Sequence, residues 1–162
     1  MVSLIMLGAV SCKKSEITKN SIIIDGVSYT TEANVSKSGL QNGAYIIYFS
    51  GTGGALFLNC SASYDGKKID LTKKEETDGL GWSIEGALGG KQLFSVSSRN
   101  GWGSNGWFKA GTLRVKKGKE GDSSVDFNIV LEGGKITDTN DNKDHTIEMN
   151  INGPIGLVNG FE

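Results

Sequence analysis

Residues 99–108 carry the side chains best suited to binding a ligand. Trp102 and Trp107 flank a glycine-rich stretch, to which Arg99 and Asn105 add hydrogen-bonding groups. An indole joins an apolar face to a polar N–H, a combination that suits stacking on a sugar ring. We therefore predict a glycan-binding platform made of Arg99, Trp102, Asn105 and Trp107. The alternative interpretation is that one or both indoles fold back and cover the open end of the core.

Residues 138–144 place oxygen-bearing side chains at alternate positions, as a calcium-binding loop does. The candidate ligands are Asp138, Asn140, Asn142 and Asp144. Two positions depart from that pattern, because Lys143 stands where the loop takes glycine and Met149 where it takes a bidentate glutamate. A polar hairpin built from Asx turns explains the same residues. Calcium is the one cofactor that the sequence indicates, and both interpretations stay open.

The remaining reactive residue types form no recognisable catalytic constellation. His145 is the single histidine, so a zinc site made of several histidines is excluded, and we expect a surface residue of a strand. Cys60 alternates with Leu56 and Leu58 along an apolar strand face, where we expect it to be buried. No G-x-S-x-G elbow is present. The sequence predicts a protein without enzymatic activity, and an enzyme of unrecognised type is the alternative.

Cys12 follows an apolar run, residues 2–10, and ends the segment Leu7-Gly8-Ala9-Val10-Ser11-Cys12. This run is too short to cross a membrane and is typical of a signal peptide. The segment resembles the type II signal-peptide processing site of bacterial lipoproteins, although no basic residue comes before Lys13. The resemblance implies cleavage before Cys12 and a lipid on its thiol, and two or three acyl chains would anchor the protein firmly. The alternative is a soluble protein whose N-terminal apolar residues form a strand.

Residues 13–20 are polar and without periodicity, which predicts a flexible tether. The Ser-Cys-Lys-Lys junction at Cys12 is similar to those of small Bacteroidetes-type outer-membrane lipoproteins. This similarity implies a location at the bacterial outer membrane, with membrane lipid as the partner of Cys12. In such proteins an acidic cluster after the cysteine accompanies export to the outer surface. Only Glu16 is acidic here, so the periplasmic and the surface-exposed face both stay open.

Composition narrows the classes of function. The 162 residues include 17 basic and 18 acidic side chains, which are interspersed and sum to a net charge of −1. No basic stripe is available for a phosphate backbone, so we expect no binding of nucleic acid. The chain contains two cysteines. If Cys12 carries lipid, Cys60 is left without a disulfide partner.

Apolar and polar residues alternate with a period of two, which predicts strands. Val125, Phe127, Ile129 and Leu131 show this most clearly. We predict strands at 22–24, 27–31, 44–50, 55–62, 68–72, 81–88, 92–98, around 112–116, 125–132 and 146–152. Asp25-Gly26, Asp65-Gly66, Gly89-Gly90 and Gly133-Gly134 are turn signals between them and favour antiparallel hairpins.

No window keeps a helical apolar stripe for three turns, so a parallel α/β sheet has no crossovers. Residues 44–49 are apolar on both faces and predict a central strand. The expected fold is all-β, an antiparallel β-sandwich of about ten strands, with an up-and-down, lipocalin-like β-barrel as the alternative. The expected organisation is a signal peptide (1–11), a lipidated cysteine with its tether (12–20) and a single all-β domain (21–162).

Together these observations predict a lipid-anchored envelope lipoprotein whose domain is a non-catalytic binding module. Glycan is the leading ligand, and a protein at the cell surface is the other partner considered. The alternative function is a structural subunit of a surface fibre or envelope complex, assembled by strand addition at an exposed sheet edge.

Overall fold

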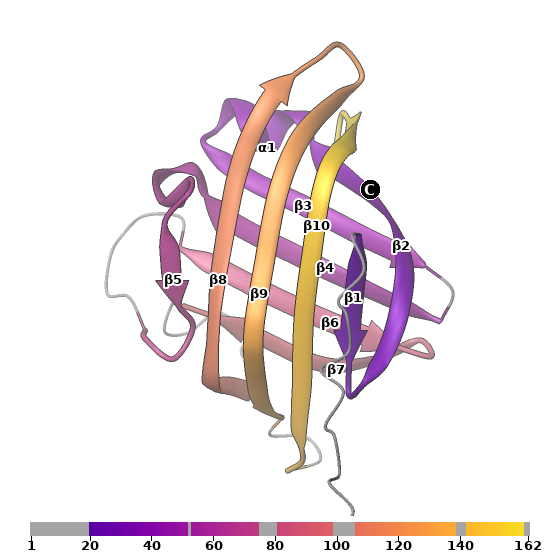
Figure 1. Ribbon diagram of the computed structural model, residues 1–162, viewed down its shortest axis with the longest axis vertical. Coiled ribbons are helices and arrows are strands. Elements are labelled where there is room, and N and C mark those ends of the chain that lie inside the picture. Colours follow the sequence, from indigo (N-terminus) through magenta and orange to yellow (C-terminus); the bar gives the residue numbers. More distant parts are fainter. Residues whose placement is uncertain (1–19, 52, 75–80, 99–105, 139–141, 161–162) are drawn as a thin grey trace, which may run out of the picture.

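In the part of the chain that the structure describes, ten strands join into a single curled sheet (Figure 1). The structure is a computed structural model that describes residues 20–51, 53–74, 81–98, 106–138 and 142–160, with only the main chain at Thr30 and Asp138. The strands are β1 (Ser21–Ile24), β2 (Val27–Ser36), β3 (Ala44–Gly51), β4 (Gly54–Ser61), β5 (Lys68–Asp70), β6 (Trp82–Leu88), β7 (Lys91–Ser97), β8 (Gly106–Glu120), β9 (Ser124–Asp138) and β10 (Asp144–Val158). The described helices are short, namely α1 (Lys37–Gln41) and the 3-10 turn η1 (Ala62–Tyr64). No helix among the described residues is long and apolar enough to span a membrane.

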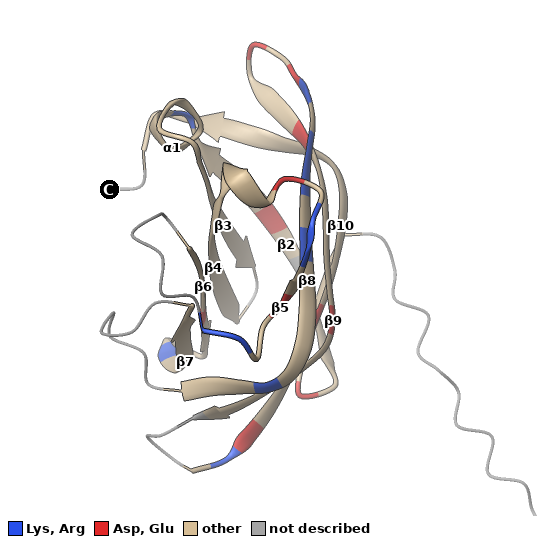
Figure 2. Cartoon of the chain, turned by 90° about the vertical axis from the view of Figure 1, so that its left-hand side faces the viewer, with Lys and Arg blue, Asp and Glu red and all other residues tan. Residues whose placement is uncertain are grey.

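The sheet folds over on itself to form two layers. Its strand order is β5-β8-β9-β10-β1-β2-β3-β4-β6-β7. Strands β8, β9 and β10 cross in front of β3, β4, β6 and β7 in Figure 1, and the side view of Figure 2 places the two sets on opposite sides. The sheet thus has the two layers of a sandwich and the continuity of an opened barrel. The all-β prediction with about ten strands is confirmed.

The core lies between the two layers. The alternating apolar residues of β9, Val125, Phe127, Ile129 and Leu131, are all buried. The ring of Phe127 meets that of Tyr45 from β3 edge to face, with 5.4 Å between ring centroids. Cys60 of β4 is buried as predicted. Strand β3 lies between β2 and β4, so its prediction as an internal strand is also confirmed.

The turn predictions succeed at two hairpins. Asp25 and Gly26 have φ of 51° and 78°, and Gly89 and Gly90 have φ of 57° and 76°. Positive φ at both central residues is what a type I′ turn requires, so these dipeptides set the β1–β2 and β6–β7 hairpins.

Gly133-Gly134 is not a turn, contrary to the sequence prediction. Strand β9 runs through both glycines, and the register against β10 shifts between Ile147 and Met149. Gly133 has φ of 59°, and a Cβ on Gly134 would lie 2.6 Å from the carbonyl oxygen of Ile147. The pair therefore forms a bulge, which bends the strand without ending it.

The sheet is mixed and not purely antiparallel. Gly156 to Val158 of β10 pair in parallel with Asn34 to Ser36 of β2. Every other pairing is antiparallel in the described residues. Because β10 also pairs with β1 and β9, it joins the N-terminal β1–β2 hairpin to the long strands β8 and β9.

Candidate functional site

Two segments that the sequence singled out meet at one end of the sheet. The start of β8, the end of β9 and the start of β10 lie together at the lower end of Figure 1. Trp107 of β8 pairs with Thr137 of β9, and Thr137 pairs with Asp144 of β10. Trp107 and Asp144, from the predicted glycan platform and the predicted calcium loop, therefore lie in one cross-strand row.

This row lies on the outer face of the sheet. The next row, Phe108, Ile136 and His145, is buried in the core. Because side chains alternate between the two faces of a strand, Trp107 points away from that core. Its exposed fraction is 46%, whereas Phe108 beside it packs edge to face on Trp82 at 5.9 Å between ring centroids. The other platform residues, Arg99, Trp102 and Asn105, lie outside the described residues.

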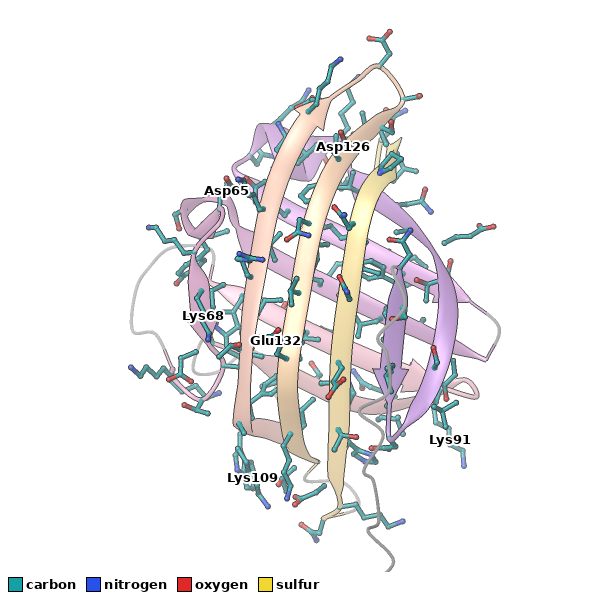
Figure 3. The ribbon with its side chains drawn as sticks, in the orientation of Figure 1. Asp65, Lys68, Lys91, Lys109, Asp126 and Glu132 are labelled. Carbon is teal, nitrogen blue, oxygen red and sulfur yellow. The ribbon has the colours of Figure 1, made fainter. Side chains whose placement is uncertain are left out.

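A polar cluster stands beside Trp107 on this face. The Asp144 carboxylate accepts hydrogen bonds at Oδ1 from Thr137 Oγ1 at 2.6 Å and from Lys109 Nζ at 2.8 Å. Lys135 Nζ lies 3.1 Å from the second oxygen, Oδ2. Hydrogen bonds from Lys109, Thr137 and Lys135 hold the pKa of Asp144 well below its usual range. We call Lys109, Lys135, Thr137 and Asp144 the lysine–aspartate cluster; Figure 3 labels Lys109 at the lower end of the sheet.

The predicted calcium ligands are only partly placed. Both oxygens of Asp144 already face ammonium groups, and Asn142 is exposed with φ of 56°. Asp138 ends β9, and Asn140 lies outside the described residues. Within those residues no group of three or more His, Cys, Asp or Glu could hold a metal ion. Asparagine tolerates positive φ, so Asn142 fits a tight turn, and the calcium hypothesis stays a prediction.

Comparisons with protein-family models, with curated proteins and with solved structures found no match for this chain. The geometry of the site is therefore the basis for the function proposed below.

His145 is not the surface residue that we expected from the sequence. Its exposed fraction is 7%, and its Nδ1 lies 2.7 Å from Asp25 Oδ2. The other oxygen of Asp25 accepts the main-chain N–H of Thr146 at 2.8 Å. Asp25 belongs to the β1–β2 turn, and that turn lies against β10 because β1 pairs directly with β10. The pair joins two segments of the fold, and the imidazole is buried away from solvent.

Sequence reasoning missed three members of the cluster, Lys109, Lys135 and Thr137. In the sequence they lie just outside the strands predicted at 112–116 and 125–132, and only the structure extends β8 and β9 to include them. Lys135 and Thr137 do lie two positions apart, which places them on one face of a strand. Their proximity to Asp144 follows only from the register between β9 and β10.

A second carboxylate stands near the opposite end of β8. Asp65 Oδ1 accepts the main-chain N–H of Lys117 at 2.7 Å and the Tyr45 hydroxyl at 3.1 Å. Burial and the hydrogen bond to Asp65 raise the pKa of Tyr45 to about 12. Figure 3 shows Asp65 toward the upper end of β8 and Lys109 at the lower end.

The outer edge of β8 is partly covered. Strand β5 pairs with residues 112–114, Gly66 N–H bonds to the Val115 carbonyl at 2.8 Å, and Leu71 N–H bonds to the Gly111 carbonyl at 3.1 Å. At the other end of the strand order, Lys74 Nζ donates to the Ser97 carbonyl of β7 at 3.0 Å. Covered edges and edge lysines oppose strand addition.

Proposed function

We propose that this protein is a lipid-anchored binding module of the bacterial outer membrane that binds glycan on the outer face of its sheet. The observation that carries the proposal is the exposed indole of Trp107 in register with Thr137 and Asp144. A sugar needs an apolar surface for its ring and polar groups for its hydroxyls. Trp107 supplies the first, and the lysine–aspartate cluster supplies the second.

The charge distribution also supports a glycan over a nucleic acid. Basic and acidic residues are interspersed along the strands and turns visible in Figure 2. A phosphate backbone requires a continuous basic stripe. A glycan requires only a local platform, so the small site at the end of β8, β9 and β10 suffices.

Tryptophan fluorescence during titration with a glycan panel tests the ligand. We expect a change in emission on binding, and Trp107→Ala should weaken binding roughly tenfold through the lost apolar contact. Val27→Ala is the matched control, because Val27 is the other large hydrophobic residue with high exposure in the described part of the chain. Unchanged emission across the panel, or equal effects of the two substitutions, would contradict the proposal.

Anchorage is proposed from the sequence resemblance at Cys12, which lies outside the described residues. Mass spectrometry of the native protein should find Cys12 acylated at the mature N-terminus. The Cys12→Ser protein should leave the membrane fraction. An unmodified peptide that still joins Cys12 to the residues before it would contradict the anchor and leave glycan binding untouched.

Strand addition, the alternative function, is the weaker hypothesis because the end strand β5 is only three residues long and Lys74 bonds to the Ser97 carbonyl of the other end strand, β7. It predicts self-association or assembly through β7, the last strand in the order. Sedimentation across a range of concentrations tests this alternative, because a monomer at every concentration would count against it.

A further inference from the structure

We infer that the glycan bound at this site is acidic, with its carboxylate or sulfate held by Lys109 and Lys135 while a ring of the same chain stacks on Trp107. This inference rests on the proposed function, since it specifies the ligand of the same site. Its starting point is that the two ammonium groups share a single carboxylate.

The lysine–aspartate cluster keeps a net positive charge and unused N–H donors. Lys109 and Lys135 bring two positive charges to the one negative charge of Asp144, which leaves the three groups with a balance of +1. Each ammonium group has three N–H donors. One donor of each is directed at Asp144 by the contacts described above, so two donors of each remain for another acceptor. Both lysine side chains are about half exposed, at 44% and 50%.

Asp144 fixes the positions of these donors. Its two oxygens face different lysines, Lys109 at Oδ1 and Lys135 at Oδ2, so the ammonium groups lie on two sides of one carboxylate. Thr137 adds a third hydrogen bond from the neighbouring strand. The hydrogen bonds from Lys109, Thr137 and Lys135 also lower the pKa of Asp144, which favours the ionised carboxylate. Long flexible side chains held in this way lose less entropy when a ligand binds.

The spacing of the site suits a saccharide chain. Trp107 and Asp144 are separated by β9, which corresponds to two inter-strand spacings, or about 10 Å. A sugar ring on the indole therefore places an acidic group of the same or the next residue within reach of the lysines. A neutral glycan would use the indole and leave the excess positive charge without a counterpart.

Paired acidic and neutral probes test this inference. Oligogalacturonate is compared with the same chain after methyl esterification, and a sulfated galactan oligosaccharide with its desulfated form, by calorimetry at low salt. At least one acidic chain should bind roughly tenfold tighter than its neutral counterpart, the gain expected of a charge-assisted hydrogen bond. Added salt should weaken this preference, because the charges are exposed to solvent.

Variants then assign the preference to the lysines. The double substitution Lys109→Gln and Lys135→Gln should abolish the preference, so that the acidic chain and the neutral chain bind with similar affinity. Trp107→Ala should weaken both. Lys91→Gln is the matched control, because Lys91 is an exposed lysine of β7 on the other layer of the sheet, labelled away from Lys109 in Figure 3. Circular dichroism confirms that each variant is folded.

The outcomes separate the two proposals. Equal affinity for acidic and neutral chains, or a preference that survives the double substitution, overturns the acidic ligand and leaves glycan binding standing. Binding to none of the four chains and to no member of the wider panel overturns both. Lysine-dependent binding to phosphatidylglycerol vesicles without any binding to glycan would instead assign the cluster to lipid headgroups, and it also overturns the inference.

Discussion

Asp65 and Asp144 are two carboxylates near opposite ends of the same long strand, and their partners differ. Asp65 accepts one main-chain N–H and the hydroxyl of buried Tyr45. Among the described residues, the partners of Asp144 are the side chains of Thr137, Lys109 and Lys135. The first carboxylate bonds to groups that the fold has already fixed. The second carboxylate positions the ammonium groups of Lys109 and Lys135, which keep N–H donors for a ligand.

This difference separates a structural cluster from a binding cluster within one sheet. Around Asp65 the neighbouring aromatics, Tyr45 and Phe127, pack against each other inside the core. Around Asp144 the neighbouring aromatic, Trp107, lies on the outer face. We therefore expect substitutions near Asp65 to change stability and those near Asp144 to change binding.

The largest expected effect is at Phe127. Phe127→Ala removes a buried ring that packs on Tyr45, and it should lower the free energy of unfolding by about 3–5 kcal/mol. Trp107→Ala, on the exposed outer face, should change it by no more than about 0.5 kcal/mol. Urea unfolding followed by far-ultraviolet circular dichroism measures both. Similar losses for the two substitutions would contradict the distinction between the packed core and the outer face.

The second largest expected effect on stability is at the Gly133-Gly134 bulge of β9. Gly134→Ala adds a Cβ 2.6 Å from the Ile147 carbonyl oxygen and should destabilise the protein by about 1–3 kcal/mol. Gly121→Ala is the control, because there the nearest atom to a Cβ is 3.5 Å away. Thermal unfolding of both variants measures the difference. A Gly134→Ala protein as stable as the control would show that the bulge accepts a side chain.

The third effect compares the carboxylates directly. Asp65→Ala leaves the Lys117 N–H and the Tyr45 hydroxyl without this acceptor and should lower the free energy of unfolding by about 1 kcal/mol. Asp144→Ala should shift the urea midpoint less and weaken binding of the acidic glycan, because the lysines lose their common partner. A larger loss of stability in Asp144→Ala, together with weaker glycan binding in Asp65→Ala, would show that Asp144 is the structural carboxylate and Asp65 the binding one.

The smallest expected effect is a pH dependence of stability that comes from Tyr45, the partner of Asp65. The folded pKa of Tyr45, about 12, lies above the value of 10.0 for an unperturbed tyrosine. The unfolded state therefore releases this proton first, and the contribution of Tyr45 to stability is complete below pH 10 and is lost as the pH rises toward 12. Tyr45→Phe should flatten this part of the stability profile in urea titrations. If the stability of Tyr45→Phe falls just as much over this pH range, other titrating groups cause the loss.

Local patterns in the sequence predicted most of the fold. Each predicted strand corresponds to an observed one, because burial on one face imposes a period of two within the strand itself. The same reasoning failed at Gly133-Gly134, since two glycines permit either a turn or a bulge and the choice depends on the partner strand.

The site was predictable only in part, because the register of β9 against β8 and β10 brings its residues together. Trp107 and Asp144 were recognised separately, from residue type and spacing. The row that joins them depends on which residue of β9 faces each neighbour. His145 shows the same limit more sharply. Its partner Asp25 is 120 residues away in the sequence, and no local pattern predicts a contact over that distance.

The position of β1 between β10 and β2 has a consequence for folding kinetics. All four residues of β1 pair with residues 147–150 of β10, and Asp25 bonds to Thr146 across a sequence separation of 121 residues, so these contacts form only after β10 has been synthesised. Pairings of such long range slow the search for the native topology. We expect refolding from urea to be slow and to reach completion in the step that docks β1 beside β10. Until then the early strands of a nascent chain remain an incomplete sheet.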